Sequence, residues 1–250
     1  MDIILHAYLF VLGAVLGSFY NVVGLRVAKG ESFVRPRSHC PNCKHVLSWL
    51  ELIPVLSYIF QKGKCKKCKK RISPIYPIFE GLTAVLFTIS PLMVGWSKEL
   101  LIALALISLL MIITVSDLKT MLIPNKIVAF FFVLFIVLRF IEPLSPWWDS
   151  IVGSVVGFTI LLLLAIVSKG GMGGGDIKLF AVLGIVLGLQ GTLLTLFFAS
   201  LLGAIIGGIG LIIKKTKKGV PIPFGPFIAA GCLISYFYSA TIMDWYIHLL

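Results

Sequence analysis

Long apolar runs are the sequence feature that most constrains what this chain can fold into. About 20 apolar residues form a helix long enough to cross the hydrocarbon core of a bilayer. With 59% hydrophobic and 13% charged residues, the chain is far more apolar than a soluble domain. About eight candidate segments follow one another along it: 3–25, 76–94, 100–116, 126–141, 151–168, 177–190, 192–213 and 224–243. We therefore predict an all-α, polytopic membrane protein, in which the two segments that meet at LGLQGTLL form either two helices or one broken helix.

The distribution of Lys and Arg predicts the orientation of the chain. When the segments alternate across a membrane, all of the 22 Lys and Arg except Lys98 and Arg139 fall on one side. Basic residues concentrate on the cytosolic side of membrane proteins, so we expect both termini to be external. The net charge of +12 then favours membrane lipids as partners and not nucleic acid, and KKTKK at 214–218 reads as a helix-end anchor.

Residues 27–73, here called the insertion, form the one sizeable polar segment. CPNC supplies Cys40 and Cys43, and CKKC supplies Cys65 and Cys68. Two such pairs at about this separation are typical of one tetrahedral zinc ion, and disulfides are disfavoured in the cytosol. Four thiolates leave no open position for water, so we expect a cytosolic, structural zinc and no catalytic metal. Reduced or redox-active cysteine pairs are the alternative.

Two aspartates at the ends of apolar runs are candidates for catalysis. Asp117 closes one run and Asp176 opens another, and the predicted orientation puts both near the cytosolic face. An ionisable group at the edge of a membrane helix is a functional hypothesis by default. If folding brings the two together they would share one proton, one acting as base toward water and the other as acid, as in aspartic proteases. The alternative is that each Asp only ends or caps a helix.

A glycine-rich stretch immediately precedes Asp176. Gly173, Gly174 and Gly175 permit backbone conformations closed to other residues and a close approach by another chain. We expect them to admit an extended peptide beside the acid, in a cavity lined by protein or water. A phosphate-binding loop is disfavoured because the Lys-Ser/Thr ending is missing, which leaves a plain flexible turn as the alternative. Lys178 either reaches this substrate site or extends to the lipid headgroups.

Together these motifs resemble the type IV prepilin peptidases, aspartic proteases of the GxGD class. GMGGGDIKL looks like the family signature, with Gly173, Gly175 and Asp176 filling G-x-G-D, and SDLKTMLIPN is similar to the family's first aspartate motif. The likeness extends to GSFYNVVGLR, to CPNC followed by LSWLELIPVLSY, and to CKKCKKRISPIYPIFE. It covers most of the chain in the family's order.

The resemblance implies a multi-pass enzyme of the bacterial cytoplasmic membrane. Such an enzyme removes the leader of prepilins and pseudopilins at the cytosolic face, in pilus, secretion or competence systems, with Asp117 and Asp176 as its catalytic pair. Many members also N-methylate the new N-terminus with S-adenosylmethionine. Glu80 would either contribute to that methylation or pair with a Lys or Arg of the insertion. The resemblance leaves the oligomeric state open.

Two regions are expected on this basis. Residues 1–98 would hold the N-terminal membrane helices and the insertion, and residues 99–250 a six-helix aspartic protease domain. An ion- or proton-coupled transporter is the alternative function, because transporters also use intramembrane carboxylates and broken helices. Transporter carboxylates are expected near the middle of the bilayer, whereas Asp117 and Asp176 stand at helix ends on one face. The peptidase is therefore favoured.

Overall fold

The computed structural model describes residues 2–168, 171–213 and 222–249. Its elements are α1 (Asp2–Ala28), η1 (Trp49–Leu52), α2 (Leu56–Phe60), α3 (Ile75–Val94), α4 (Glu99–Thr120), α5 (Asn125–Ile141), α6 (Asp149–Val167), α7 (Gly174–Ile212) and α8 (Gly225–Leu249). Within these residues no β-strand forms, so the prediction of an all-α chain is confirmed. The KKTKK stretch at 214–218 lies outside the described residues.

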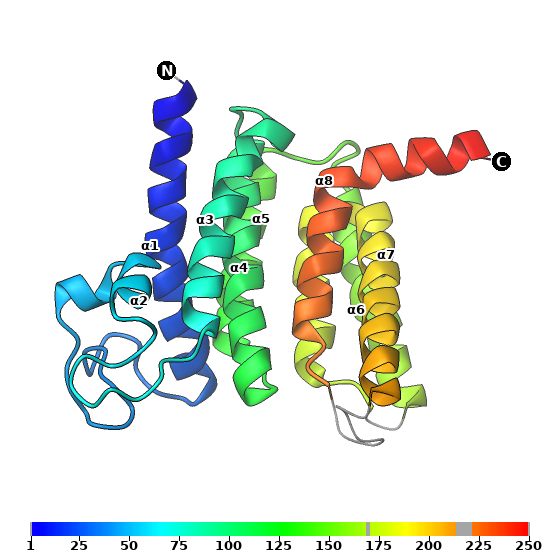
Figure 1. Ribbon diagram of the computed structural model, residues 1–250. Helices are drawn as coiled ribbons and strands as arrows, with labels where there is room; N and C mark the ends of the chain where they lie inside the picture. Colours follow the sequence, from blue (N-terminus) through cyan, green and yellow to red (C-terminus); the bar gives the residue numbers. More distant parts are fainter. Residues whose placement is uncertain (1, 169–170, 214–221, 250) are drawn as a thin grey trace. The chain divides into compact units, whose positions relative to one another are not determined.

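The long helices coincide with the predicted apolar segments (Figure 1). Six helices of the described chain are long and apolar enough to cross a membrane: α1, α3, α4, α6, α7 and α8. The 17-residue α5 covers the predicted segment 126–141 and is the shortest of the long helices. α7 contains two predicted segments, 177–190 and 192–213. The outward faces of α1 and α6 carry exposed Val and Phe side chains, as a lipid-facing surface requires.

A single break divides α7. Gly188 has a φ of 69° and a ψ of −173°, which is outside the helical region and open chiefly to glycine. Buried Arg139 donates to the carbonyl oxygen of Val186 at 2.6 Å, and the Asp149 carboxylate accepts the N–H of Leu189 at 3.1 Å. These two side chains satisfy backbone groups that the break removes from the helical ladder. The broken-helix version of our prediction is therefore correct.

The chain folds into two compact units, Met1–Val115 and Ser116–Leu250. In the first unit, α1 packs on α3 through glycines. A Cβ on Gly13 would lie 2.8 Å from the Cα of Ala84, and one on Gly17 would lie 2.9 Å from the Cα of Glu80. Such close backbone approach is how membrane helices gain contact area. The insertion connects these two helices, since it leaves α1 and returns at the start of α3.

The second unit is built around α7, which packs on α6, α8 and α5. Small residues again line the contacts: Gly157 of α6 lies against the carbonyl oxygen of Phe180, and Gly231 of α8 lies against that of Thr195. Both predicted catalytic aspartates, Asp117 and Asp176, belong to this unit, as do the segments that surround them. The candidate site can therefore be described inside one compact body.

Candidate active site and thiolate centre

Asp117 lies in the last turn of α4 and is buried, with 6% of its surface exposed. Its Oδ2 accepts a hydrogen bond of 2.7 Å from the backbone N–H of Gly225. Gly225 is the first residue of α8, and the first N–H groups of a helix have no partner within the helix. The carboxylate therefore sits against the positive end of a helix dipole, where negative charge is favourable.

Asp176 is the third residue of α7 and is partly buried. Its backbone N–H donates to the carbonyl oxygen of Gly173 at 3.1 Å, which folds the glycine stretch back as the first turn of the helix. Its carboxylate lies close enough to that of Asp117 for the two to interact electrostatically. The structure thus brings together two acids that stand 59 residues apart in the sequence.

The predicted substrate-binding glycines lie at the entry to α7, and they differ in their surroundings. A Cβ on Gly175 would lie 2.7 Å from the Cβ of Ile123, so only glycine lets the segment after α4 pack this closely. A Cβ on Gly173 would meet the Asp176 carboxylate at 3.0 Å, whereas Gly174 has open space around it. Gly173 and Gly174 are both exposed. The glycines therefore leave one side of Asp176 uncovered.

Lys178 does not extend freely into solvent. Its Nζ donates to Oδ1 of Asn125 at 2.9 Å, and Asn125 is the first residue of α5. The pair joins α7 to the segment that follows the Asp117 helix. Both readings of Lys178 that the sequence left open, substrate contact and headgroup contact, stay predictions.

Two hydrogen-bond partners in this region were not anticipated from the sequence. Gly225 supplies the N–H that holds Asp117, and Asn125 holds Lys178. The signal for Gly225 was its place in PFGPF (residues 223–227), where Pro and Gly mark the start of a helix. Asn125 ends the SDLKTMLIPN stretch, in which only the aspartate drew attention.

The four cysteines of the insertion form one cluster. The sulfur atoms of Cys40, Cys43, Cys65 and Cys68 all lie within 4.8 Å of one another, and none is in a disulfide. Cys40 Sγ is 3.8 Å from Cys68 Sγ, and Cys43 Sγ is 3.9 Å from Cys65 Sγ. Tetrahedral zinc with Zn–S bonds of about 2.3 Å requires sulfurs about 3.8 Å apart. The donor set and its spacing therefore fit one zinc ion.

The two CxxC turns have the same backbone design. In the first turn the N–H of Lys44 bonds to the carbonyl of Cys40, and in the second the N–H of Lys69 bonds to the carbonyl of Cys65. Backbone N–H groups also point at sulfur. They lower the pKa of the Cys68 thiol to about 6, chiefly through the N–H of Lys70. A thiolate is the form that binds a metal, so the lowered pKa of Cys68 favours metal binding by the second turn.

The histidines of the insertion are not needed as ligands. His45 Nε2 lies 3.2 Å from Glu51 Oε2, and His39 Nδ1 lies 3.0 Å from the carbonyl oxygen of Arg37. Neither histidine belongs to the four-sulfur cluster.

Glu80 is buried in the first half of α3 and bonds to the backbone. It accepts the N–H of Val55 at 2.7 Å, and Val55 has a φ of 60°, a conformation that a β-branched residue rarely adopts. Among the described residues no Lys or Arg lies within ion-pair distance of Glu80. The pairing with a basic residue of the insertion was therefore wrong, because Glu80 instead holds the strained turn before α2 against α3.

Fold and site together define a class of protein. It is a multi-pass helical membrane protein that has two carboxylates within electrostatic reach of each other in one compact unit and a four-thiol cluster in the other. Two family models match the chain: the bacterial peptidase A24 N-terminal domain over residues 11–94, and the type IV leader peptidase family over residues 104–208.

Curated relatives match along nearly the whole length. A prepilin leader peptidase/N-methyltransferase of Bacillus subtilis (strain 168) is 45% identical over 239 residues, 96% of both chains. Proteins with the same name from Aeromonas salmonicida (strain A449) and Pseudomonas putida are 37% and 34% identical, over 85% and 93% of this chain and 75% and 90% of their own. No solved structure matches. The chain belongs to the type IV leader peptidase family.

Proposed function

We propose that this protein is a membrane aspartic endopeptidase that removes the leader peptide of type IV prepilins or pseudopilins. The observation that supports the proposal is that Asp117 and Asp176 belong to one unit and lie near enough to interact electrostatically, next to exposed Gly173 and Gly174. The names of the relatives support the substrate class. The transporter alternative has no comparable support, since every relative cited here is named as a peptidase.

The two aspartates would cleave the peptide bond through one water molecule. One carboxylate takes a proton from the water while the water oxygen bonds to the scissile carbonyl carbon. The other aspartic acid gives its proton to the carbonyl oxygen. The tetrahedral intermediate then collapses and the carbon–nitrogen bond breaks. The leaving nitrogen receives the proton that the first carboxylate took from water, and a hydroxyl of the intermediate returns a proton to the second aspartate as the new carboxyl group forms. No acyl-enzyme forms. The N–H of Gly225 fixes one rotamer of Asp117, so this side chain needs little reorganisation during the reaction.

The substrate would lie extended across the entry to α7. Gly173 and Gly174 are exposed and leave room for a backbone to pass beside Asp176. Gly175 contributes differently, because it lets Ile123 close one side of the site. We assign Lys178 to the rim of this site, where its bond to Asn125 would keep α7 and α5 in register.

The reaction would take place at the cytosolic face of a bacterial cytoplasmic membrane. The concentration of Lys and Arg on one side supports this orientation, with both termini external. The ranges matched by the two family models support residues 1–98 and 99–250 as the two functional regions. Zinc held by the four cysteines would be structural, fixing the insertion without taking part in hydrolysis.

Methylation of the new N-terminus is a second proposed activity. The relatives carry N-methyltransferase in their names, and S-adenosylmethionine would be the methyl donor. One experiment tests both activities: purified protein in detergent is incubated with a prepilin, with and without S-adenosylmethionine, and the product is weighed by mass spectrometry. Leader loss reports the peptidase, and a further methyl mass reports the transferase.

Substitution of the aspartates tests the catalytic assignment. Asp117→Asn and Asp176→Asn should each leave expression and folding intact and abolish leader removal, because an amide cannot exchange the proton. Asp244→Asn is the matched control, since Asp244 is an exposed aspartate in α8. Processing at a near-parental rate by either of the first two variants would remove that residue from the catalytic pair.

A further inference from the structure

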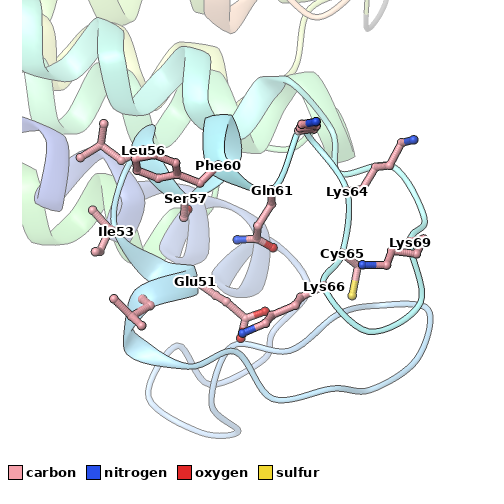
Figure 2. Close-up of a pocket in the computed structure, with 12 residues that line it drawn as sticks. Glu51, Ile53, Leu56, Ser57, Phe60, Gln61, Lys64, Cys65, Lys66 and Lys69 are labelled. Carbon is pink, nitrogen blue, oxygen red and sulfur yellow. The ribbon is translucent and has the colours of Figure 1, made fainter.

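A pocket in the insertion is lined only by residues of the first unit and has no role in the proposed hydrolysis. It has a volume of about 570 Å³, within the size range of sites for small organic ligands. Figure 2 shows its two kinds of wall: Ile53, Leu56 and Phe60 on one side, and a group of lysines on the other. The lysines that line it are Lys62, Lys64, Lys66 and Lys69.

The apolar wall is open to the surroundings of the protein. Phe60 is 82% exposed and Leu56 is 51% exposed, and Trp49, just before the pocket residue Leu50, is 72% exposed. Side chains of this size are seldom left together in water, and Trp in particular is enriched at membrane–water interfaces. This wall therefore fits hydrocarbon better than it fits solvent.

The lysine wall carries more positive charge than its neighbours offset, although a zinc ion held by four thiolates, one of them the pocket residue Cys65, would add a net charge of about −2 beside it. Glu51 is the one carboxylate that lines the pocket, and it already accepts bonds from Ser48 and His45. Within the described residues, no carboxylate lies within ion-pair distance of the four lysines. An anion brought to this wall would meet a net positive charge that these groups offset only in part.

The chain holds the pocket near a membrane surface. The insertion leaves α1 after Ala28 and enters α3 at Ile75, and both are membrane-spanning candidates. Within the first unit, Glu80 of α3 also bonds to Val55, which lies directly before α2. Both ends of the insertion, and Val55 beside the pocket, are thus attached to helices that are candidates to span the membrane.

We propose that this pocket binds an anionic phospholipid of the adjacent leaflet, with the phosphate at the lysines and an acyl chain along Ile53, Leu56 and Phe60. The two walls match the two ends of such a molecule, whereas a free phosphate or an acidic peptide would leave the apolar wall unoccupied. The pocket is independent of the aspartate chemistry, so its failure and the failure of the proposed peptidase would be separate results.

Lipid quenching of Trp49 tests the proposal on the full chain in nanodiscs. A variant keeps Trp49 as its one tryptophan, the others being changed to Phe: Trp96, Trp147, Trp148 and Trp245. Bilayers of phosphatidylglycerol and phosphatidylcholine are prepared in pairs, with bromine on the acyl chains of only one of the two lipids. Brominated phosphatidylglycerol should quench Trp49 more strongly than brominated phosphatidylcholine does at the same mole fraction.

Neutralising the lysine wall should remove that preference. Each lysine near a membrane surface favours an anionic lipid about fivefold, so Lys64→Gln with Lys66→Gln should lower the quenching preference severalfold. Lys29→Gln with Lys67→Gln is the matched control, because these exposed lysines carry the same charge and do not line the pocket. The zinc content of both variants must equal that of the parent, which excludes damage to the cysteine turns.

Lysine acetylation of the unaltered protein gives a second readout. Phosphatidylglycerol discs should protect Lys62, Lys64 and Lys66 relative to Lys29 and Lys67. Equal protection by soluble phosphate or by an acidic peptide in phosphatidylcholine discs would assign the pocket to those ligands and overturn the lipid proposal. Absence of quenching by either brominated lipid, or equal quenching by both, would also overturn it.

Discussion

The hydrogen bond between Gly225 and Asp117 can be tested by adding a single methyl group. In Gly225→Ala the new Cβ would lie 2.9 Å from Oδ2, 3.0 Å from Cβ and 3.2 Å from Cγ of Asp117. Ordinary contacts begin at about 3.4 Å, so the carboxylate must withdraw by about 0.5 Å. The 2.7 Å bond from the Gly225 N–H would then lengthen to about 3.2 Å, the limit of a good hydrogen bond.

The expected loss follows from the strength of that bond. A hydrogen bond to a charged group contributes about 1.5–3 kcal/mol, and each 1.36 kcal/mol in a barrier is about tenfold in rate. Gly225→Ala should therefore lower kcat for leader removal about ten- to a hundredfold. KM should change little, because Gly225 acts on Asp117 and does not line the glycine entry at α7.

The assay is cleavage of a purified prepilin in detergent, followed over time by the shift in product mass. Gly208→Ala is the matched control, since a Cβ there meets nothing within 4 Å. Thermal unfolding of both variants separates a displaced carboxylate from a loosened helix contact. Parental kcat in a folded Gly225→Ala enzyme would refute the role given to this N–H.

Two further predictions concern the rest of the molecule. Asn125→Leu and Lys178→Met should each lower the kcat/KM of leader removal. The double variant should have about the same kcat/KM as the less active single variant, because the two side chains share one hydrogen bond. Strictly additive losses would contradict this. Cys65→Ser should abolish stoichiometric zinc binding and expose the insertion to hydrogen exchange, whereas brief treatment of the parent with a chelator should leave cleavage intact; instant loss of cleavage would point to a catalytic metal.

The parts of the fold that the sequence predicted are those set by local rules. Apolar run length determines where a helix can cross a bilayer, so each predicted segment lies in a helix of the structure. The sequence predicted either two helices or one broken helix around Gly188, because glycine interrupts an apolar run there. Cysteine spacing likewise predicted the four-sulfur cluster, since each turn carries its own two ligands.

The contacts between distant segments were not readable in the same way. Gly225 and Asp117 are 108 residues apart in the sequence, and the residues around each one do not indicate that the two form a hydrogen bond. Glu80 shows the same limit. A buried carboxylate near many lysines suggested an ion pair, yet its partner is the backbone of Val55, because that turn leaves an N–H pointing at α3. Composition indicates that a buried carboxylate needs a partner, but only the folded structure shows which donor lies against it.

Placing two acids at the edge of a membrane domain is unfavourable unless the fold provides compensating charge. Two helix beginnings supply it here. Asp176 lies in the first turn of α7, and Asp117 accepts an N–H from the first residue of α8. Helix N-termini favour negative charge through their backbone N–H groups. The tight junction between Gly175 and Ile123 keeps the first of these helix beginnings in place. The glycines of this site therefore let helices start at the acids, in addition to the substrate role that we propose for them.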